Sequence, residues 1–581
     1  MKALLYLNSY FLKYKWSMLF GIVITIAAKI FSLFTPKLIG NLVDVISSFL
    51  SSDRSSLVQF KADLFINISL LIGSALLAGL FTFFMRQTII NVSRYVEFDL
   101  KNEIYKQYQR LSLSFYKSNR TGDLMSRISE DVSKVRMYVG PAIMYTMNMV
   151  TLFIVAFINM YRKAPSLTLY IIIPLPLLSL SIYYLSRQIN IRSTEVQQHL
   201  STLSAFTQEA FSGIAILKSF AIEPLSNREF QSLADTQREK QINLTKVQAL
   251  FFPMMLLLIG FSNILVLYIG GKQYMDGTIK EFGTIVEFLV YVNMLTWPVA
   301  TLGWVTSIVQ EAEASQQRIN DFLLIKPEIQ NPSLEPFQIK GSIRFENVNF
   351  TYPDTNIKAI NNLSFSIGAG ETLAIIGKTG AGKSSILDLI SRLYDPESGT
   401  IYIDEQDISK VNLNDLRRQI GYVTQEAFLF SDSIRNNIRF GRLEASDEEI
   451  IESAKIADLD DNITSFAKGY DTLLGERGVT LSGGQKQRMS IARSIVKNPV
   501  ILLLDDCLSA VDTKTEERIL KNLKPIIAKR TTIIVSHRIS SIKNADHILV
   551  IENGSVVQSG KHKDLIGSPG YYQLIYKEQH S

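Results

Sequence analysis

Six long apolar runs in the first half of the chain constrain its fold more than any other feature. They occupy about residues 16–39, 63–85, 138–161, 166–189, 247–271 and 281–308. A helix needs about 20 predominantly apolar residues to cross the hydrocarbon core of a bilayer, and each run is long enough. Prolines inside the fourth and sixth runs are tolerated in membrane helices, because neighbouring helices satisfy the freed carbonyls. The runs therefore predict an α-helical membrane domain with six transmembrane helices.

The connections between these runs predict the orientation of the domain. Two of them, about residues 87–137 and 190–246, are long, helical in pattern and rich in Lys and Arg. Positive charge beside membrane segments favours the cytoplasmic side. We therefore expect a multi-pass protein of the cytoplasmic (inner) membrane, with both termini and both long connections in the cytoplasm. The first residues, about 1–16, are expected to form an amphipathic helix on the inner membrane surface.

Charge and cysteine content exclude several other classes. The formal net charge of +6 is modest, and we assign it to basic loops beside a lipid bilayer rather than to nucleic-acid binding. The single cysteine, Cys507, excludes a disulfide within the chain. Lys29 and Glu287 fall inside predicted spans, where charges are costly. They either line a substrate cavity or reach the membrane surface, and both readings stay open.

A shift in composition marks the end of the membrane domain. Residues 326–340 are polar and proline-rich, as linkers are. Residues 342–350 then alternate as a strand does, and strands and helices alternate to the end of the chain. The predicted organisation is a transmembrane domain over 1–325, a linker over 326–340 and an α/β nucleotide-binding domain of the P-loop type over 341–581.

The pattern G-x-x-x-x-G-K-S predicts a phosphate-binding loop at residues 377–384. An apolar strand, 372–376, precedes the loop and a helix follows it, which is the context that the motif requires. Glycines let the backbone N–H groups converge on phosphates, the lysine neutralises phosphate charge, and the last serine binds Mg²⁺ through its hydroxyl. The candidate ATP-binding residues here are Gly377, Lys378, Thr379, Gly380, Ala381, Gly382, Lys383, Ser384 and Ser385.

A second apolar strand is followed by two aspartates, which are expected to lie beside the phosphate-binding loop. Residues 500–504 read Val-Ile-Leu-Leu-Leu and end in Asp505 and Asp506. A carboxylate at the carboxyl end of a buried strand is placed to reach the metal ion of a bound nucleotide. We therefore expect Asp505, with Ser384, to be a ligand of Mg²⁺, and Asp506 to hold or deprotonate the attacking water.

The sequence Leu-Ser-Gly-Gly-Gln at 481–485 identifies the family that the second half resembles. It opens a helix at 486–496, and a serine with two glycines at a helix N-terminus makes an anion site. Between a phosphate loop and an apolar strand ending in Asp, this is the signature of the ATP-binding cassette (ABC) family. With six preceding helices, the whole chain resembles an ABC exporter half-transporter. The resemblance implies that Ser482, Gly483, Gly484 and Gln485 cap an ATP held by a second cassette, so the chain needs a partner chain.

Other positions match the motifs of this family in order. Tyr352, in Phe-Thr-Tyr-Pro, matches the aromatic residue that stacks on adenine. Gln425 matches the glutamine that meets Mg²⁺ and the attacking water, and His537 matches the switch histidine that contacts the γ-phosphate. Residues 475–478 match the short cross-linking loop of exporters, and residues 509–512 match the loop that contacts the opposite cassette.

Two stretches of the long connections resemble the regions that couple cassette and membrane helices in exporters. They are residues 114–123, Ser-Phe-Tyr-Lys-Ser-Asn-Arg-Thr-Gly-Asp, and residues 209–214, Glu-Ala-Phe-Ser-Gly-Ile. In such a protein, ATP that closes the cassettes favours one state of the membrane helices, and hydrolysis resets it. Simple helical spacing is the alternative interpretation of both stretches.

One residue departs from the family pattern. Most competent cassettes carry Glu after the strand aspartate, where this chain has Asp506. Its carboxylate is one methylene shorter, and catalysis by a general base is sensitive to reach. Since the signature motif is intact, the combination resembles one member of a heterodimeric exporter with one weak and one active ATP site. A homodimer in which Asp506 still supports slow hydrolysis is the alternative.

The resulting hypothesis is an ATP hydrolase coupled to export of hydrophobic or amphipathic small molecules, as in bacterial multidrug exporters. ATP and Mg²⁺ are the expected cofactors, and the bilayer, a second half-transporter and the substrate are the expected partners. A homodimeric flippase of lipids or lipid precursors is a second hypothesis. A channel or regulator gated by ATP is a third.

Overall fold

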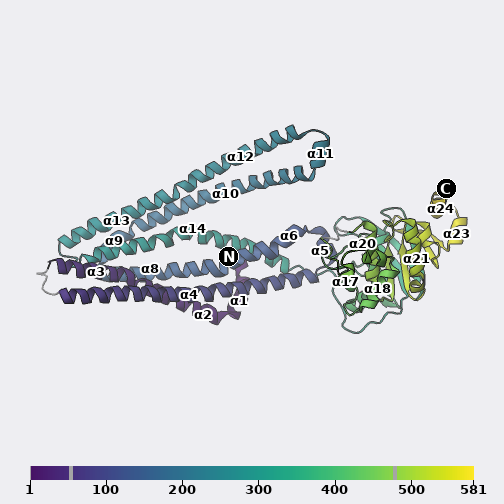
Figure 1. Ribbon diagram of the computed structural model, residues 1–581, viewed down its shortest axis with the longest axis horizontal. Coiled ribbons are helices and arrows are strands. Elements are labelled where there is room, and N and C mark those ends of the chain that lie inside the picture. The colour runs from purple at the N-terminus through teal and green to yellow at the C-terminus, as the bar shows by residue number, and fades with distance from the viewer. Residues whose placement is uncertain (1, 52–56, 476–480, 581) are drawn as a thin grey trace. The chain divides into compact units, whose positions relative to one another are not determined.

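The computed structural model describes residues 2–51, 57–475 and 481–580. Within them the chain forms two compact units (Figure 1). The first unit comprises Met1–Tyr108 and Gly122–Ile325, and the second comprises Gln109–Thr121 and Lys326–Ser581. A short segment between two long helices of the first unit therefore belongs to the second unit. The first is helical and the second is α/β, as predicted.

The N-terminal residues pack on a long helix of their own unit. They form η1 (Ala3–Leu7) and α1 (Asn8–Lys13). The hydroxyls of Tyr6 and Tyr10 both donate to the carboxylate of Glu103, the first at 2.5 Å. Large apolar side chains of this segment are nevertheless exposed, which is compatible with the expected amphipathic helix. Its location at the inner membrane surface stays a prediction.

Five helical stretches of the described residues are long and apolar enough to cross a membrane. The predicted fourth span, about 166–189, is not among these five. There the chain forms two helices, α9 (Pro165–Ile172) and α10 (Pro174–Ser212), separated at Ile173. The count of six spans stays a prediction. The helices of the five stretches are α2 (Lys15–Ser32) with α3 (Phe34–Ser51), α4 (Leu57–Arg110), α6 (Thr121–Ser126) with η2 (Arg127–Asp131), α7 (Val132–Met137), η3 (Tyr138–Ala142) and α8 (Ile143–Lys163), α12 (Glu223–Ala249) with α13 (Phe251–Met275), and α14 (Gly283–Leu323).

Several of these helices are longer than a bilayer requires. Helix α4 has 54 residues, which at a rise of 1.5 Å per residue is about 80 Å, against a hydrocarbon core of about 30 Å. Helices α10 (Pro174–Ser212) and α12 run side by side, with α9 (Pro165–Ile172) at one end and α11 (Ile214–Ser219) at the other (Figure 1). The long connections, about 87–137 and 190–246, are thus helical over most of their length, as their pattern predicted.

Helices α3 and α14 approach each other closely through glycines. A Cβ atom at Gly283 would lie 2.0 Å from the carbonyl oxygen of Gly40, and the N–H of Gly283 donates to Asp44 at 2.6 Å. Glu287, one turn further along α14, is only 4 % exposed and packs against Gly40. Glu287 is therefore surrounded by protein atoms in this structure. Whether it also lines a substrate cavity stays a prediction.

The second unit contains two sheets. An antiparallel sheet has the order β2-β1-β4-β5, and a six-stranded sheet has the order β10-β9-β3-β8-β7-β6, in which β9, β3, β8, β7 and β6 are parallel neighbours. Apolar residues of β3, β7 and β8 form the centre of the core. The strands are β1 (Ile343–Thr351), β2 (Lys358–Ile367), β3 (Thr372–Gly377), β4 (Ser398–Ile403), β5 (Gln406–Asp407), β6 (Ile420–Val423), β7 (Ile501–Asp505), β8 (Thr531–Val535), β9 (His547–Glu552) and β10 (Ser555–Gly560).

Helices flank these sheets, and the connections at the carboxyl ends of the parallel strands are where ligands bind in α/β folds. The helices of the unit are α5 (Leu113–Ser118), α15 (Lys383–Ile390), α16 (Leu413–Arg418), α17 (Ile434–Arg439), α18 (Asp447–Ile456), α19 (Asp460–Thr464), η4 (Gly469–Asp471), α20 (Gly483–Val496), α21 (Thr513–Ile527), α22 (Ile539–Ile542), α23 (His562–Gly567) and α24 (Tyr571–His580).

Candidate functional site

The loop between β3 and α15 has the geometry of a phosphate cradle. The Lys383 ammonium is buried and donates to the carbonyls of Gly377, at 2.9 Å, and Lys378, at 2.8 Å, which curls the loop around it. Gly380 and Gly382 have φ of 80° and 95°, a region that L side chains rarely adopt. A Cβ atom at Gly382 would also lie 2.2 Å from the carbonyl of Ala359. Only glycine fits there, and the N–H groups that open α15 face the loop.

Ser384 and Asp505 meet at the start of α15 and the end of β7. The Ser384 hydroxyl donates to the Asp505 carboxylate at 3.1 Å, and Asp505 is 3 % exposed. A hydroxyl and a carboxylate oxygen at this distance are hard ligands of the kind that Mg²⁺ uses beside nucleotide phosphates. The donor set therefore fits the predicted magnesium ion.

Three neighbouring strands bring the other predicted residues to the same edge of the sheet. Val423 of β6 lies opposite Leu504 of β7, and Asp505 lies opposite Val535 of β8. Gln425 follows β6 and His537 follows β8, so both lie beside the end of β7. The ends of β6, β7 and β8 thus place Gln425, Asp505 and His537 at one edge of the sheet, and their roles there stay predictions.

Asp506 is held in an unusual conformation beside His537. Its φ is 41°, a left-handed value that Asp tolerates better than most residues. Its N–H donates to the carbonyl of Val535 at 2.9 Å, and its carboxylate accepts a hydrogen bond from the backbone N–H of His537. The carboxylate that follows β7 is therefore tied to the backbone of the next strand's loop.

Burial shifts the pKa values of four titratable groups at this edge. It raises the pKa of Asp505 to about 6, against the hydrogen bond from Ser384, and it raises the pKa of Asp506. Burial also lowers the pKa of Lys383, opposed by the two aspartates. The pKa of His537 is lowered by burial and by the Lys383 charge, which favours the neutral imidazole. Perturbed groups gathered at one edge are typical of functional sites.

Tyr352 lies just after β1, on the antiparallel sheet. Its hydroxyl is 2.9 Å from the hydroxyl of Ser385 in α15. Its ring packs edge-to-face against Phe350 and Tyr394, with centroids 4.8 Å and 5.4 Å away. The predicted adenine-stacking residue is therefore joined to the helix that follows the phosphate loop.

The signature motif begins helix α20 with a capping box. The Ser482 hydroxyl accepts from the N–H of Gln485, and the Gln485 amide oxygen accepts from the N–H of Ser482 at 2.9 Å. A Cβ atom at Gly484 would lie 2.9 Å from the carbonyl of Ala510, so a glycine lets the 509–512 loop approach. The cross-linking loop predicted at 475–478 falls mostly on 476–478, which lie outside the described residues.

Gln487 was not singled out from the sequence, yet it connects three predicted motifs. Its amide nitrogen lies 3.3 Å from the Ser509 hydroxyl and 3.5 Å from the Gln425 carbonyl, and its amide oxygen accepts from the N–H of Ala510 at 3.1 Å. The side chain is buried. Its position shortly after the signature motif was the one available signal.

A second unpredicted pair lies behind His537. The Arg538 guanidinium donates to the carboxylate of Glu516, which is 1 % exposed, and approaches the carbonyls of Ser509 and Val511 at 3.4 Å. The hydroxyl of Ser541 donates to the same carboxylate. This ion pair, in which Glu516 is buried and Arg538 is partly exposed, joins the histidine loop to the 509–512 loop, and no local sequence pattern predicts it.

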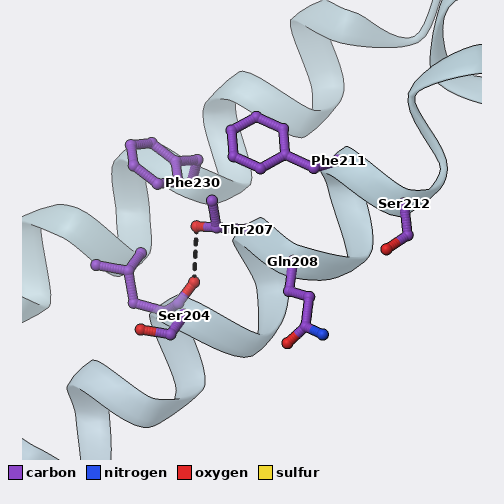
Figure 2. Close-up of a pocket in the computed structure, with 7 residues that line it drawn as sticks. Ser204, Thr207, Gln208, Phe211, Ser212 and Phe230 are labelled. Carbon is purple, nitrogen blue, oxygen red and sulfur yellow. Dashed lines mark hydrogen bonds between the residues drawn. The ribbon is translucent and has the colours of Figure 1, made fainter. Parts of the chain in front are cut away.

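The second predicted coupling region lies at the far end of α10. Gly213 ends α10, and the short helix α11 follows, with Phe211, Ile216 and Phe220 more than half exposed. Figure 2 shows an adjoining pocket between α10 and α12, in which Thr207 donates to the carbonyl of Leu203 at 2.8 Å. The aromatic rings of Phe211 and Phe230 form its apolar wall (Figure 2). This end of the helix pair thus presents an apolar surface.

Comparison with known proteins covers both units of the chain. The family described as "ABC transporter transmembrane region" matches residues 18–299, and the family described as "ABC transporter" matches residues 360–509. A solved structure, "Structure of a bacterial Atm1-family ABC exporter with ATP bound", is similar with a TM-score of 0.79 and 27 % identity, over 97 % of this chain and 99 % of that one.

Relatives with similar full-length sequences agree with these matches. A probable multidrug resistance ABC transporter ATP-binding/permease protein, YheI of Bacillus subtilis, is 32 % identical over 99 % of this chain and 96 % of its own length. The multidrug resistance-like ATP-binding protein MdlA of Buchnera aphidicola is 34 % identical over 99 % and 97 %. An ATP-dependent lipid A-core flippase of Syntrophus aciditrophicus is 36 % identical over 83 % and 80 %. The chain therefore belongs to the ABC transporter family, as an exporter half-transporter that acts in a dimer and couples ATP hydrolysis to transport across a membrane.

Proposed function

We propose that this chain is one half of a heterodimeric exporter that moves hydrophobic or amphipathic small molecules across the cytoplasmic membrane. The proposal depends mainly on one observation: Lys383, Asp505, Asp506 and His537 lie at one edge of a sheet. Among them, Asp506 occupies the position of the proposed general base, whose carboxylate must reach the attacking water. The multidrug names of two full-length relatives support the substrate class.

Nucleotide binding is assigned to residues on both sheets. The Lys383 ammonium and the N–H groups that open α15 hold the phosphates, and the Tyr352 ring stacks on adenine. Ser482 and the N–H groups that open α20 cap an ATP held by the partner cassette, as a helix N-terminus favours anions. Each chain therefore supplies half of two sites.

The ligands of Mg²⁺ are assigned to Ser384 and Asp505, with Gln425 beside them. Mg²⁺, when bound, neutralises charge on the phosphoryl group that is transferred. The buried Asp505 must be ionised to serve, and the Ser384 hydroxyl stabilises that form by hydrogen bonding. His537, neutral near pH 7 because burial lowers its pKa, is left to contact the γ-phosphate.

The weak ATP site is assigned to Asp506. A carboxylate one methylene shorter than glutamate, and bonded to the His537 N–H, is held back towards the protein backbone. A misplacement of about 1 Å can cost about 100-fold in rate. The second site, built on the partner's phosphate loop and this chain's intact signature, then performs most of the hydrolysis.

Exposed apolar side chains on both units support assembly with a second chain. Phe428, Phe430 and Phe440 are exposed on the cassette, and their rings pack together with centroids 5.3 Å and 4.7 Å apart. The residues around α11 form a second apolar surface. Exposed apolar patches of this kind mark protein interfaces.

The subunit composition is tested by expressing the chain alone and together with a second half-transporter that carries Glu at the position of Asp506. The heterodimer proposal expects a lone chain with little ATPase and a fast complex. Robust ATPase linked to transport in the lone chain would support a homodimer instead.

Two other functions are separated from export by vesicle assays. The flippase relative supports transport of a lipid or lipid precursor as a second candidate. Vesicles that accumulate a fluorescent amphipathic dye against its gradient, only with ATP, indicate a pump for small molecules. Movement of a labelled lipid between leaflets without dye accumulation would favour the flippase. Dye equilibration without accumulation would indicate a gate. A Lys383→Ala variant is the control in every assay.

A further inference from the structure

A lysine in the first stretch that resembles a coupling region, residues 114–123, lies over the predicted adenine-stacking residue. Lys117 belongs to α5, within the segment Gln109–Thr121 that is part of the second unit. Its ammonium lies 4.7 Å from the ring centroid of Tyr352 and 5.2 Å from that of Tyr394. Both distances fall within the range of about 6 Å over which a cation is attracted to an aromatic face.

The two tyrosines form a braced platform for this ammonium. Their rings are perpendicular, with centroids 5.4 Å apart, and Phe350 packs against both. Phe350 and Tyr394 are buried, whereas Tyr352 is half-buried and keeps part of its surface accessible. A cation that holds the one accessible ring restricts the orientations that the ring can take.

Helix α5 is itself fixed to the second unit. The Ser114 hydroxyl donates to the Glu328 carboxylate, and the Ser112 hydroxyl approaches the same carboxylate at 3.3 Å. Ser114 is 5 % exposed. A displacement of α5 would therefore carry Lys117 away from the ring of Tyr352.

The charge on Lys117 is also supported. Burial lowers the pKa of this lysine, but its neighbours Tyr394, Tyr352 and Asp388 raise it by more, so the net shift is upward. Asp388 is held by a hydrogen bond from the Tyr422 hydroxyl at 3.0 Å. The ammonium form, which the cation–π contact requires, is thus retained at neutral pH.

We propose that Lys117 is a positioning residue of the base-binding site, which orients the Tyr352 ring for adenine and makes affinity for the base depend on the location of α5. The inference rests on the proposed stacking role of Tyr352. The chain runs from α4 through α5 to α6, so α5 is covalently continuous on both sides with helices of the first unit. Because coupling is reciprocal, a base stacked on Tyr352 stabilises the seat of α5 by the same factor.

The phosphate loop gives the proposal a direct test, because a ligand without a base bypasses Tyr352. Full-length chain, in its purified complex, is photolabelled with 8-azido-ATP at a concentration well below saturation, and the label on this chain is resolved by gel electrophoresis. The concentrations of ATP and of tripolyphosphate that halve labelling are then measured. Orienting an aromatic ring by a partly exposed cation–π contact corresponds to about two- to tenfold in affinity.

The expected result is a loss specific to the base. Lys117→Met and Lys117→Gln weaken competition by ATP about two- to tenfold and leave competition by tripolyphosphate unchanged. Lys117→Arg, which keeps the cation, behaves like the parent, and so does Lys410→Met, which removes an exposed lysine of the same unit. In a Tyr352→Ala background Lys117→Met has no further effect, because the aromatic ring that Lys117 orients is absent.

Two outcomes would overturn the inference. One is an unchanged ratio of the ATP and tripolyphosphate values in both Lys117→Met and Lys117→Gln. The other is a loss that persists in the Tyr352→Ala background, which would indicate a purely structural role. Failure of the proposed nucleotide site is distinguishable, since then Lys383→Ala would leave both competitors unaffected.

Discussion

The side-chain amide of Gln579 donates to the backbone carbonyl of His537 at 2.8 Å. The amide oxygen of the same side chain accepts from the N–H of Ile539, also at 2.8 Å. Gln579 lies in the last helix of the chain, α24, and thus holds the loop that carries the proposed switch histidine from behind. Nothing in the spacing of the sequence indicates a link between these two positions.

We expect Gln579→Ala to loosen the histidine loop without unfolding the unit. Two hydrogen bonds worth about 0.5–1.5 kcal/mol each are lost, so opening of the loop becomes about five- to 140-fold more frequent. Hydrogen exchange followed by mass spectrometry should show faster exchange in peptides covering 536–541. Gln573→Ala is the matched control, because that side chain bonds Ile566 within the C-terminal helices. Equal exchange in the two variants would contradict the clamp.

Asp506→Glu should restore the missing reach of the proposed base. An added methylene carries the carboxylate towards the attacking water, and correct placement of a general base contributes about 100-fold or more. We expect phosphate release from this chain's site to rise at least about tenfold, and Asp506→Asn to lower it further. The measurement is ATPase of the complex, with Lys383→Ala added to assign the gain. A glutamate variant no faster than the parent would refute the weak-site assignment.

Gly283→Ala should destabilise the packing of α3 against α14. The new methyl would meet the backbone oxygen of Gly40 at 2.0 Å, and overpacking of this kind costs about 1–3 kcal/mol. The expected observation is a lower melting temperature of the full chain in detergent. Gly271→Ala is the control, since a Cβ atom there meets nothing within 4 Å and alanine is favoured in helices. If both variants melt together, the close approach is not a constraint.

Asp388 should give the unfolding free energy a dependence on pH. Burial raises the pKa of its carboxyl, opposed by the Tyr422 hydrogen bond and the Lys117 charge, so the folded state favours the protonated form relative to the unfolded chain. Stability of the parent therefore falls as pH rises from about 4 through the folded pKa. The melting temperature of Asp388→Asn, relative to that of the parent, should therefore be higher at about pH 8 than at about pH 5. A constant difference would contradict the raised pKa.

Much of the secondary structure of the nucleotide-binding domain could be predicted from local sequence patterns. The strand at 372–376, the glycine-rich loop and the following helix were expected from their residues, and the structure has β3, the loop and α15 there. The apolar run ending in Asp505 was likewise observed as β7. Such elements are determined by residues adjacent in the chain, so their signal lies within one window of sequence.

Contacts between residues that are far apart in the sequence could not be predicted from local patterns. The seat of Lys117 over Tyr352 and the clamp of Gln579 on His537 depend on the folded arrangement, and no periodicity announces them. The prolines of the fourth predicted span were expected to be tolerated within one helix, yet the helix is interrupted there at Ile173, because a helix commonly ends at the residue before a proline. The stretch over 326–340 was predicted to be a linker, yet it belongs to the second unit, where Glu328 accepts a hydrogen bond from Ser114 and Ile339 is part of the hydrophobic core.

The central claim is that ATP is bound between two cassettes and that this drives the membrane helices. Its most direct test is a cryo-electron microscopy structure of the full complex, purified through a tag on this chain, with and without ATP and Mg²⁺. The account predicts closed cassettes with nucleotide between Lys383 of one chain and the signature motif of the other, and separated cassettes in a Lys383→Ala variant. Nucleotide bound at Lys383 while the cassettes remain apart and the membrane helices keep the conformation seen without nucleotide would contradict it.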